Sequence, residues 1–193
     1  MTEKDTKKKP GMLLHICCAP DSTAVFERLA LDFETVGFFH NPNIHPTNEY
    51  RKRLVEARRV TLELGFPLIV PVFDPDPWNR AVKGLEDEPE GGDRCAVCFR
   101  LNLRATASKA QELGIPFFTT TLTISPHKDS ERILRIGRES GSEFGVSFLG
   151  ENFKKREGFK RSLELSRDLG IYRQGYCGCR FSLRKDPLGA GTS

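Results

Sequence analysis

The chain has 193 residues, of which 38% are hydrophobic and 29% are charged, and its 30 Lys and Arg residues against 26 Asp and Glu residues give a net charge of +4. A chain of this length forms one domain that buries about 70% of its unfolded surface, so the core is stable without disulfides. The absence of any run near the ~20 apolar residues of a membrane span excludes a transmembrane protein, and the composition excludes a fibrous one.

Both ends of the chain are expected to be disordered tails. Residues 1–10 are Lys-rich, and residues 185–193 read KDPLGAGTS, so neither segment has an apolar face to pack. The start also lacks the apolar stretch of a secretory signal. We therefore expect a single catalytic domain over residues 11–184, a cytoplasmic location and no membrane partner.

Short apolar runs alternate with longer amphipathic segments along this domain. A helix that follows the first run would take its cap oxygen from Asp21 or Ser22. The acidic stretch 74–93 holds Trp78, the only tryptophan, and is expected to be a solvated loop with one short helix, or else a lid. Strands are predicted at residues 12–17, 36–40, 68–73, 117–121 and 146–149, and helices at residues 22–31, 48–64, 95–113, 129–140 and 154–169.

This order of elements predicts an α/β fold with a doubly wound, mainly parallel sheet. Strands that are apolar throughout, rather than at alternate positions, are typical of a sheet covered on both faces. Ligands bind such sheets beyond the carboxyl ends of the strands. The functional site is therefore expected at that edge.

The six cysteines occur as three close pairs that are far apart in the sequence. The pairs are Cys17 with Cys18, Cys95 with Cys98, and Cys177 with Cys179. In a reducing compartment, cysteines are more often metal ligands, catalytic groups or packing residues than disulfides. The first pair ends a buried strand, the second opens a helix, and the third lies in a glycine-bracketed turn. A site made from all three would have to be assembled by the fold.

Thiolates in this number select zinc, copper(I) or an iron–sulfur cluster. A structural zinc would use four cysteines and leave two idle, whereas a 4Fe-4S cluster takes four and leaves two for a second function. Buried packing cysteines are the third alternative. We favour the redox cluster, because every pair lies in a turn or at the start of a helix.

The first loop resembles that of PP-loop (HUP-like) nucleotide-binding enzymes. Asp21 and Ser22 match the end of their Ser-Gly-Gly-x-Asp-Ser loop, but Cys17, Cys18 and Ala19 take the Ser-Gly-Gly positions, and Pro20 precedes the aspartate. Glycine lets backbone wrap a phosphate, and proline has no N–H to donate. ATP binding is therefore not expected, and the loop offers two sulfurs instead.

Three motifs together resemble the epoxyqueuosine reductase QueH family: H-I-C-C-A-P-D-S, G-G-D-R-C-x-x-C-F-R-L and G-Y-C-G-C-R-F-S, over about residues 12–184. The resemblance implies removal of the epoxide oxygen from a modified wobble base in the tRNA anticodon loop. It also implies a cysteine-bound 4Fe-4S cluster with a further metal ion, iron by expectation, close by. The predicted cofactor and metal ligands are Cys17, Cys18, Cys95, Cys98, Cys177 and Cys179.

Two further residues are predicted to act in this reaction. Asp21 is expected to give an oxygen ligand to the second metal, or else to cap a helix. Tyr176 is expected to donate a proton or to stack on a base, or else to be a packing residue. Because removing the oxygen as water takes two electrons, we expect an external electron donor as a partner. We do not expect DNA as a partner.

The substrate tRNA would be bound through its phosphates. Basic residues cluster within residues 51–59 and 154–161, where they would contact phosphates or form solvated helix faces. Two other functions stay open at this point. One is a nucleotide-dependent tRNA-modifying transferase, and the other is a zinc-stabilised RNA-binding module.

Overall fold

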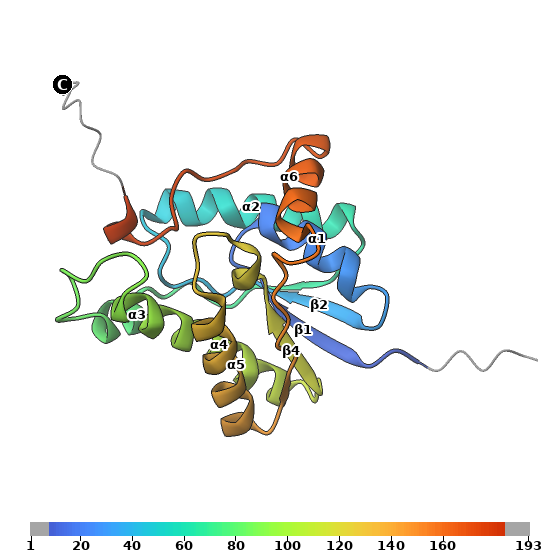
Figure 1. Cartoon of the computed structure of the whole chain (residues 1–193), viewed down its shortest axis with the longest axis horizontal. Helices are drawn as coiled ribbons and strands as arrows, with labels where there is room; N and C mark the ends of the chain where they lie inside the picture. The colour runs from blue at the N-terminus through green and yellow to red at the C-terminus, as the bar shows by residue number, and fades with distance from the viewer. Residues whose placement is uncertain (1–7, 184–193) are drawn as a thin grey trace, which may run out of the picture.

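The computed structural model describes residues 8–183, in which five parallel strands form one sheet in the order β3-β2-β1-β4-β5 (Figure 1). The predicted doubly wound, parallel α/β fold is confirmed. The strands are β1 (Gly11–His15), β2 (Glu34–Phe38), β3 (Leu68–Ile69), β4 (Phe117–Thr120) and β5 (Ser147–Phe148). The helices are α1 (Ala19–Leu29), α2 (Thr47–Glu63), α3 (Asp76–Ala81), α4 (Asp93–Glu112), α5 (Ser130–Phe144) and α6 (Gly158–Asp168), with short 3-10 turns η1 (Thr121–Ile124) and η2 (Arg180–Ser182).

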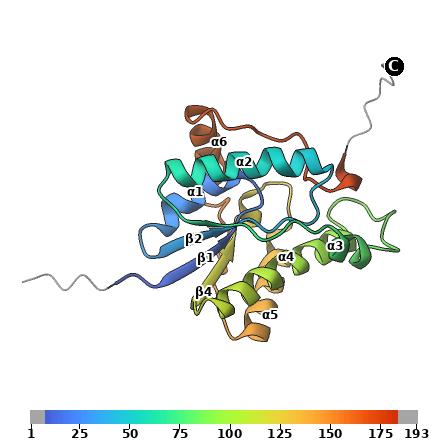
Figure 2. The ribbon, with the colours of Figure 1, turned by 180° about the vertical axis from the view of Figure 1, so that it is seen from behind.

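Helices cover both faces of this sheet. Helices α1, α2 and α6 lie on one face, and α4 and α5 lie on the other (Figures 1 and 2). The side chains of β1 alternate between the two cores: Met12 and Leu14 belong to one, and Leu13 belongs to the other. All three are fully buried. Burial on both sides explains why the strand reads as a continuous apolar run.

A buried histidine fastens the carboxyl end of β1 to its two neighbours. Nδ1 of His15 lies 2.9 Å from Oγ1 of Thr120 at the end of β4, and Nε2 lies 3.0 Å from the carbonyl oxygen of His40 after β2. Burial lowers the pKa of His15 to about 3, so the ring is neutral. His15 is a satisfied core residue, and it holds together the strand ends from which the site loops start.

Helix α1 begins earlier than predicted, and the prediction of a cap at Asp21 or Ser22 was wrong. The N-cap position is Cys18, whose side chain makes no capping hydrogen bond within the described residues. Pro20 in the first turn explains the early start, because its fixed φ suits the first helical positions and it needs no hydrogen-bond acceptor there. Asp21 therefore lies inside the first turn, with its carboxylate available for another role.

Most of the other predicted elements differ from the structure by one to four residues at an end, and three of these differences have a local cause. The third strand stops at Ile69 because the segment that follows contains Pro71. The last helix starts at Gly158, after Arg156 and Glu157 adopt left-handed φ values of 51° and 58°. Helix α5 runs on to Phe144 and ends where Gly145 takes a φ of 64°.

The acidic stretch 74–93 contains the predicted short helix, α3, but its tryptophan is not solvated. Trp78 is 2% exposed and packs beside Cys98 and Cys179. The predicted tails, residues 1–10 and 185–193, lie outside the described residues apart from residues 8–10. Within the described chain, none of the helices is both long and apolar enough to span a membrane.

Candidate metal centre

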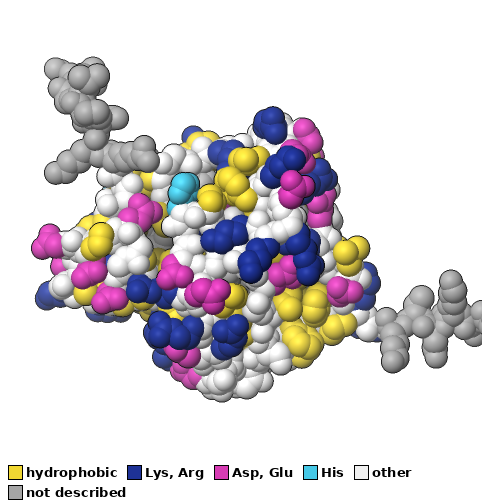
Figure 3. Space-filling view, viewed as in Figure 1, with side chains coloured by type: hydrophobic (Ala, Val, Ile, Leu, Met, Phe, Trp, Pro, Cys, Tyr) yellow, Lys and Arg dark blue, Asp and Glu magenta, His cyan; other side chains and the backbone are white. Residues whose placement is uncertain are grey.

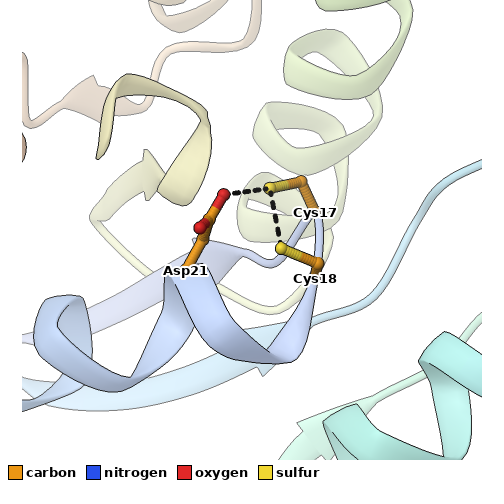
Figure 4. A group of neighbouring side chains, drawn as sticks. All are labelled: Cys17, Cys18 and Asp21. Atoms are coloured by element: carbon orange, nitrogen blue, oxygen red, sulfur yellow. Dashed lines mark hydrogen bonds between the residues drawn. The ribbon is translucent and has the colours of Figure 1, made fainter. Parts of the chain in front are cut away.

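Cys17, Cys18 and Asp21 bring three metal-ligating side chains together where β1 passes into α1 (Figure 4). Sγ of Cys17 lies 3.9 Å from Sγ of Cys18 and 3.6 Å from Oδ2 of Asp21. Over residues 8–183, this Cys17 group is the only set of three or more His, Cys, Asp or Glu side chains whose ligand atoms all lie within 4.8 Å of one another. Such spacing suits one metal ion.

The two thiols of the Cys17 group differ in acidity. A hydrogen bond between the thiols lowers the pKa of Cys17, and the same bond, together with burial, raises the pKa of Cys18 well above its usual value. Thr121 of η1 adds to this difference, because its hydroxyl donates to Cys17 Sγ at 3.2 Å and accepts from the Cys17 amide at 3.1 Å. Cys17 is thus the readier metal ligand, since the thiolate is the form that binds.

The other four cysteines line one cavity between α4 and the C-terminal turn. Cys95 and Cys98 lie in the first turns of α4, three residues apart and so on one side of the helix, and Cys177 and Cys179 lie in the turn before η2. Burial and neighbouring thiols raise the pKa of Cys98 well above its usual value, and burial raises that of Cys177. We call this the cysteine cavity.

The turn that carries Cys177 and Cys179 is held by a buried arginine. Arg53 of α2 is 2% exposed; it donates to the carbonyl oxygens of Cys177 at 3.0 Å and Tyr176 at 3.2 Å, and it pairs with Glu49 at 2.7 Å. Gly178 has a φ of 128°, and a Cβ there would lie 2.9 Å from Nη1 of Arg53. The glycine therefore lets the backbone lie close against the guanidinium.

Replacing this arginine is expected to damage both the fold and the site. Arg53→Met removes the cation that pairs with Glu49, which keeps only the Tyr172 hydroxyl as a donor, and it removes the donor to two part-buried carbonyl oxygens, so the free energy of unfolding should fall by about 3 kcal/mol or more. Urea unfolding measures the loss. Arg51→Met on the same helix is the control, because Arg51 is exposed and makes no ion pair or side-chain hydrogen bond within residues 8–183, so its loss should change the free energy of unfolding by about 0.5 kcal/mol or less. Equal losses in the two variants would contradict this role of Arg53.

Lys128 connects the cysteine cavity with the Cys17 group. It lines the cavity beside Cys177. Burial opposes its charge, but the negative groups at Cys177, Cys17 and Asp21 outweigh burial and raise the pKa of Lys128 above its usual value. Cys17 and Cys95 also pack against the same core cluster. The structure thus places the six cysteines in two groups, and their action as one cofactor site stays a prediction.

The remaining predicted residues are placed less favourably for catalysis. The Tyr176 hydroxyl donates to the His45 carbonyl oxygen, and Arg53 lies over its ring, so the catalytic role of Tyr176 stays a prediction. Within the two basic stretches, Arg59 and Arg161 are engaged with acidic partners. Figure 3 shows Lys and Arg side chains across the middle of one face and around α6, with acidic side chains between them.

Three residues at the site had no role in the sequence interpretation: Trp78, Asn102 and Lys128. Trp78 and Lys128 line the cysteine cavity. Asn102 lies one turn after Cys98 on α4, with its Nδ2 3.8 Å from Cys98 Sγ. The spacing from Cys98 to Asn102, one turn of a helix, was the only signal in the sequence that could have indicated one of these contacts.

Known proteins resemble this chain both in sequence and in fold. Residues 12–185 match the family described as "Epoxyqueuosine reductase QueH". Two curated proteins of that name are similar to it: the one from Streptococcus pyogenes serotype M1 is 40% identical over 91% of this chain and 71% of its own length, and the one from Thermotoga maritima is 39% identical over 89% and 90%. A solved structure of a predicted subunit of tRNA methyltransferase from Methanocaldococcus jannaschii aligns with a TM-score of 0.53 and 14% identity, over 81% of this chain and 74% of that one. The structural likeness shows a shared fold alone.

Proposed function

Because the chain belongs to the epoxyqueuosine reductase QueH family, and is therefore an oxidoreductase, we propose that it removes the epoxide oxygen of epoxyqueuosine in the tRNA anticodon loop to give queuosine. The observation that supports the proposal is that the six free cysteines fall into two groups, the Cys17 group at the carboxyl end of β1 and the four thiols of the cysteine cavity. Electrons would come from an external donor, and the tRNA substrate fits a cytoplasmic enzyme.

The two groups of cysteines suit two different inorganic cofactors. Four thiols in the cysteine cavity match the ligand number of a 4Fe-4S cluster. A single zinc ion, with Zn–S bonds of about 2.3 Å, would need its sulfurs close together. The ligand atoms of the Cys17 group all lie within 4.8 Å of one another, whereas no three thiols of the cysteine cavity do, so the wider spacing of the cavity thiols favours a cluster. Burial raises the pKa values of Cys98 and Cys177, so a bound cation would be needed to keep both as thiolates.

The Cys17 group would hold the second metal ion, for which iron is expected. Two soft sulfurs and one carboxylate oxygen are a donor set suited to a transition metal. When bound, the cluster supplies electrons one at a time and the metal ion supplies Lewis acidity toward the epoxide oxygen.

The protein's own residues would organise the substrate and its protons between the two groups. The Lys128 ammonium, kept charged by the thiolates and Asp21, holds a proton at Nζ within the site and offsets negative charge from both groups. Thr121 keeps the sulfur of Cys17 in place. The modified base would have to leave the anticodon stack to reach this edge of the sheet, as bases do in other nucleobase-modifying enzymes.

The same first loop argues against a nucleotide-dependent reaction. Its Cys17-Cys18-Ala19-Pro20 sequence lacks the glycines that wrap a phosphate, and Pro20 removes an N–H from the first turn of α1. We therefore expect the energy for the reaction to come from reducing equivalents alone.

The direct test supplies tRNA carrying epoxyqueuosine with a low-potential reductant under anaerobic conditions, with and without ATP. Mass spectrometry of the nucleosides should show the loss of one oxygen atom at the same rate in both reactions. Strict dependence on ATP would favour the transferase alternative. A zinc-containing, sulfide-free protein that binds tRNA without turnover would favour the RNA-binding module.

A further inference from the structure

Trp78 places an indole ring against the cysteine cavity. The ring belongs to α3 and is 2% exposed, and it forms a small core with Val82 and Cys179 against which Cys98 also packs. The acidic stretch that contains Trp78 is otherwise mostly at the surface. The Trp78 side chain is therefore buried next to cysteines that are expected to be ligands.

The indole N–H of Trp78 is a buried donor with an unmet hydrogen-bonding requirement. Among residues 8–183 it has no acceptor in bonding geometry. Cys98 packs against the same small core, and the N–H favours the thiolate form of Cys98 against the opposing effect of burial. An unsatisfied buried donor destabilises the fold, so its presence beside a sulfur indicates an acceptor that the site acquires in use.

A second N–H donor approaches the same sulfur from α4. Nδ2 of Asn102 lies 3.8 Å from Sγ of Cys98 and 3.1 Å from the carbonyl oxygen of Cys98. The amide is oriented by His40, whose Nδ1 lies 3.0 Å from Oδ1 of Asn102. Burial lowers the pKa of His40, so its ring is neutral and Nδ1 donates to the amide oxygen. This fixes the NH₂ group toward Cys98 and toward Oδ1 of Asn43, to which it donates at 3.3 Å.

We propose that Trp78 and Asn102 are positioning residues that donate N–H hydrogen bonds to the sulfur-ligated centre at Cys98 and thereby raise its reduction potential. The inference rests on the proposed function, in which Cys98 is a cluster ligand. Hydrogen bonds to the sulfurs of an iron–sulfur cluster are among the features that set its potential. A donor stabilises the reduced state more, because that state carries more negative charge on sulfur.

The variant Trp78→Phe tests the indole N–H while keeping an aromatic ring. We expect the equilibrium constant for one-electron reduction to fall about tenfold, which corresponds to a potential about 59 mV more negative. An EPR-monitored redox titration measures this shift. Val82→Ala is the matched control, because it loosens the same small core without removing a donor, and its potential should equal that of the wild type.

A label on the native protein gives a second, independent readout. Because Trp78 is the only tryptophan of the chain, protein grown on indole-¹⁵N tryptophan carries the label at this one nitrogen. Pulsed EPR of the reduced cluster should then show a ¹⁵N hyperfine coupling. This measurement needs no variant, so it decides the question even where Trp78→Phe fails to fold.

Failure of the inference is distinguishable from failure of the proposed function. A wild-type protein without iron and sulfide would overturn the proposed function, and the inference with it. A wild-type protein with an intact cluster, no ¹⁵N coupling and a potential unchanged by Trp78→Phe would overturn the inference alone.

Discussion

The variant Asp21→Asn should lose turnover by about 100-fold or more while keeping its fold and its cluster. In the Cys17 group, the Asp21 carboxylate lies 3.6 Å from Cys17 Sγ, and it is the only oxygen ligand of the three. A neutral amide is a poor substitute for a carboxylate ligand, and loss of even outer-shell support of a metal costs 10–100-fold. Nucleoside analysis of epoxyqueuosine tRNA measures the turnover.

The stability of this variant separates a ligand from a purely structural residue. Asp21 lies in the first turn of α1 without being its N-cap, so its contribution through the helix dipole is about 1 kcal/mol or less. Ser22→Ala is the control at the neighbouring position, where the buried hydroxyl donates to the Ala19 carbonyl oxygen. Full turnover in Asp21→Asn, with unchanged metal content, would remove the carboxylate from the reaction.

The variant Cys98→Ser should lose the cluster itself. Cys98 lines the cysteine cavity with Cys177, Cys179 and Cys95, and its half-buried sulfur is the one that Trp78 and Asn102 approach. We expect acid-labile sulfide and the broad absorbance near 400 nm to fall at least tenfold, with turnover lost.

The variant Cys17→Ser is the matched comparison for Cys98→Ser. Cys17→Ser should keep the sulfide and lose turnover, because Cys17 belongs to the group that would hold the single metal ion. Thr106→Val, two turns after Cys98 on α4, is a control for loss of a buried polar group without contact to a sulfur. If Cys98→Ser and Cys17→Ser had the same sulfide content, the division of the six cysteines into two sets would be wrong.

Much of the fold and the location of the site followed from the sequence. Apolar strands that alternate with amphipathic helices define a doubly wound sheet, and the order of its strands places the residues after β1 and β4 side by side. The family resemblance read from three cysteine motifs was confirmed by the match over residues 12–185. Local sequence patterns were sufficient for these two predictions, because the burial of a strand and the order of the motifs depend on neighbouring residues in the sequence.

The grouping of the site residues could not be read from the sequence. Asp21 looked equally suited to a helix cap, and only the early start of α1 at Ala19 shows that it is not one. Trp78 lies in a charged, turn-rich stretch whose composition favours exposure, yet it is buried through contacts with Cys98 and Cys179. The buried Arg53 looked like one more basic residue of a helix face. Each of these roles depends on a contact between segments far apart in the chain, which local patterns do not encode.

Iron and acid-labile sulfide analysis of the anaerobically prepared protein tests the central claim most directly. The proposed site requires about four sulfides and at least four irons per chain, with the sulfide lost in Cys98→Ser and kept in Cys17→Ser. Stoichiometric zinc without acid-labile sulfide in the wild-type protein would contradict the account.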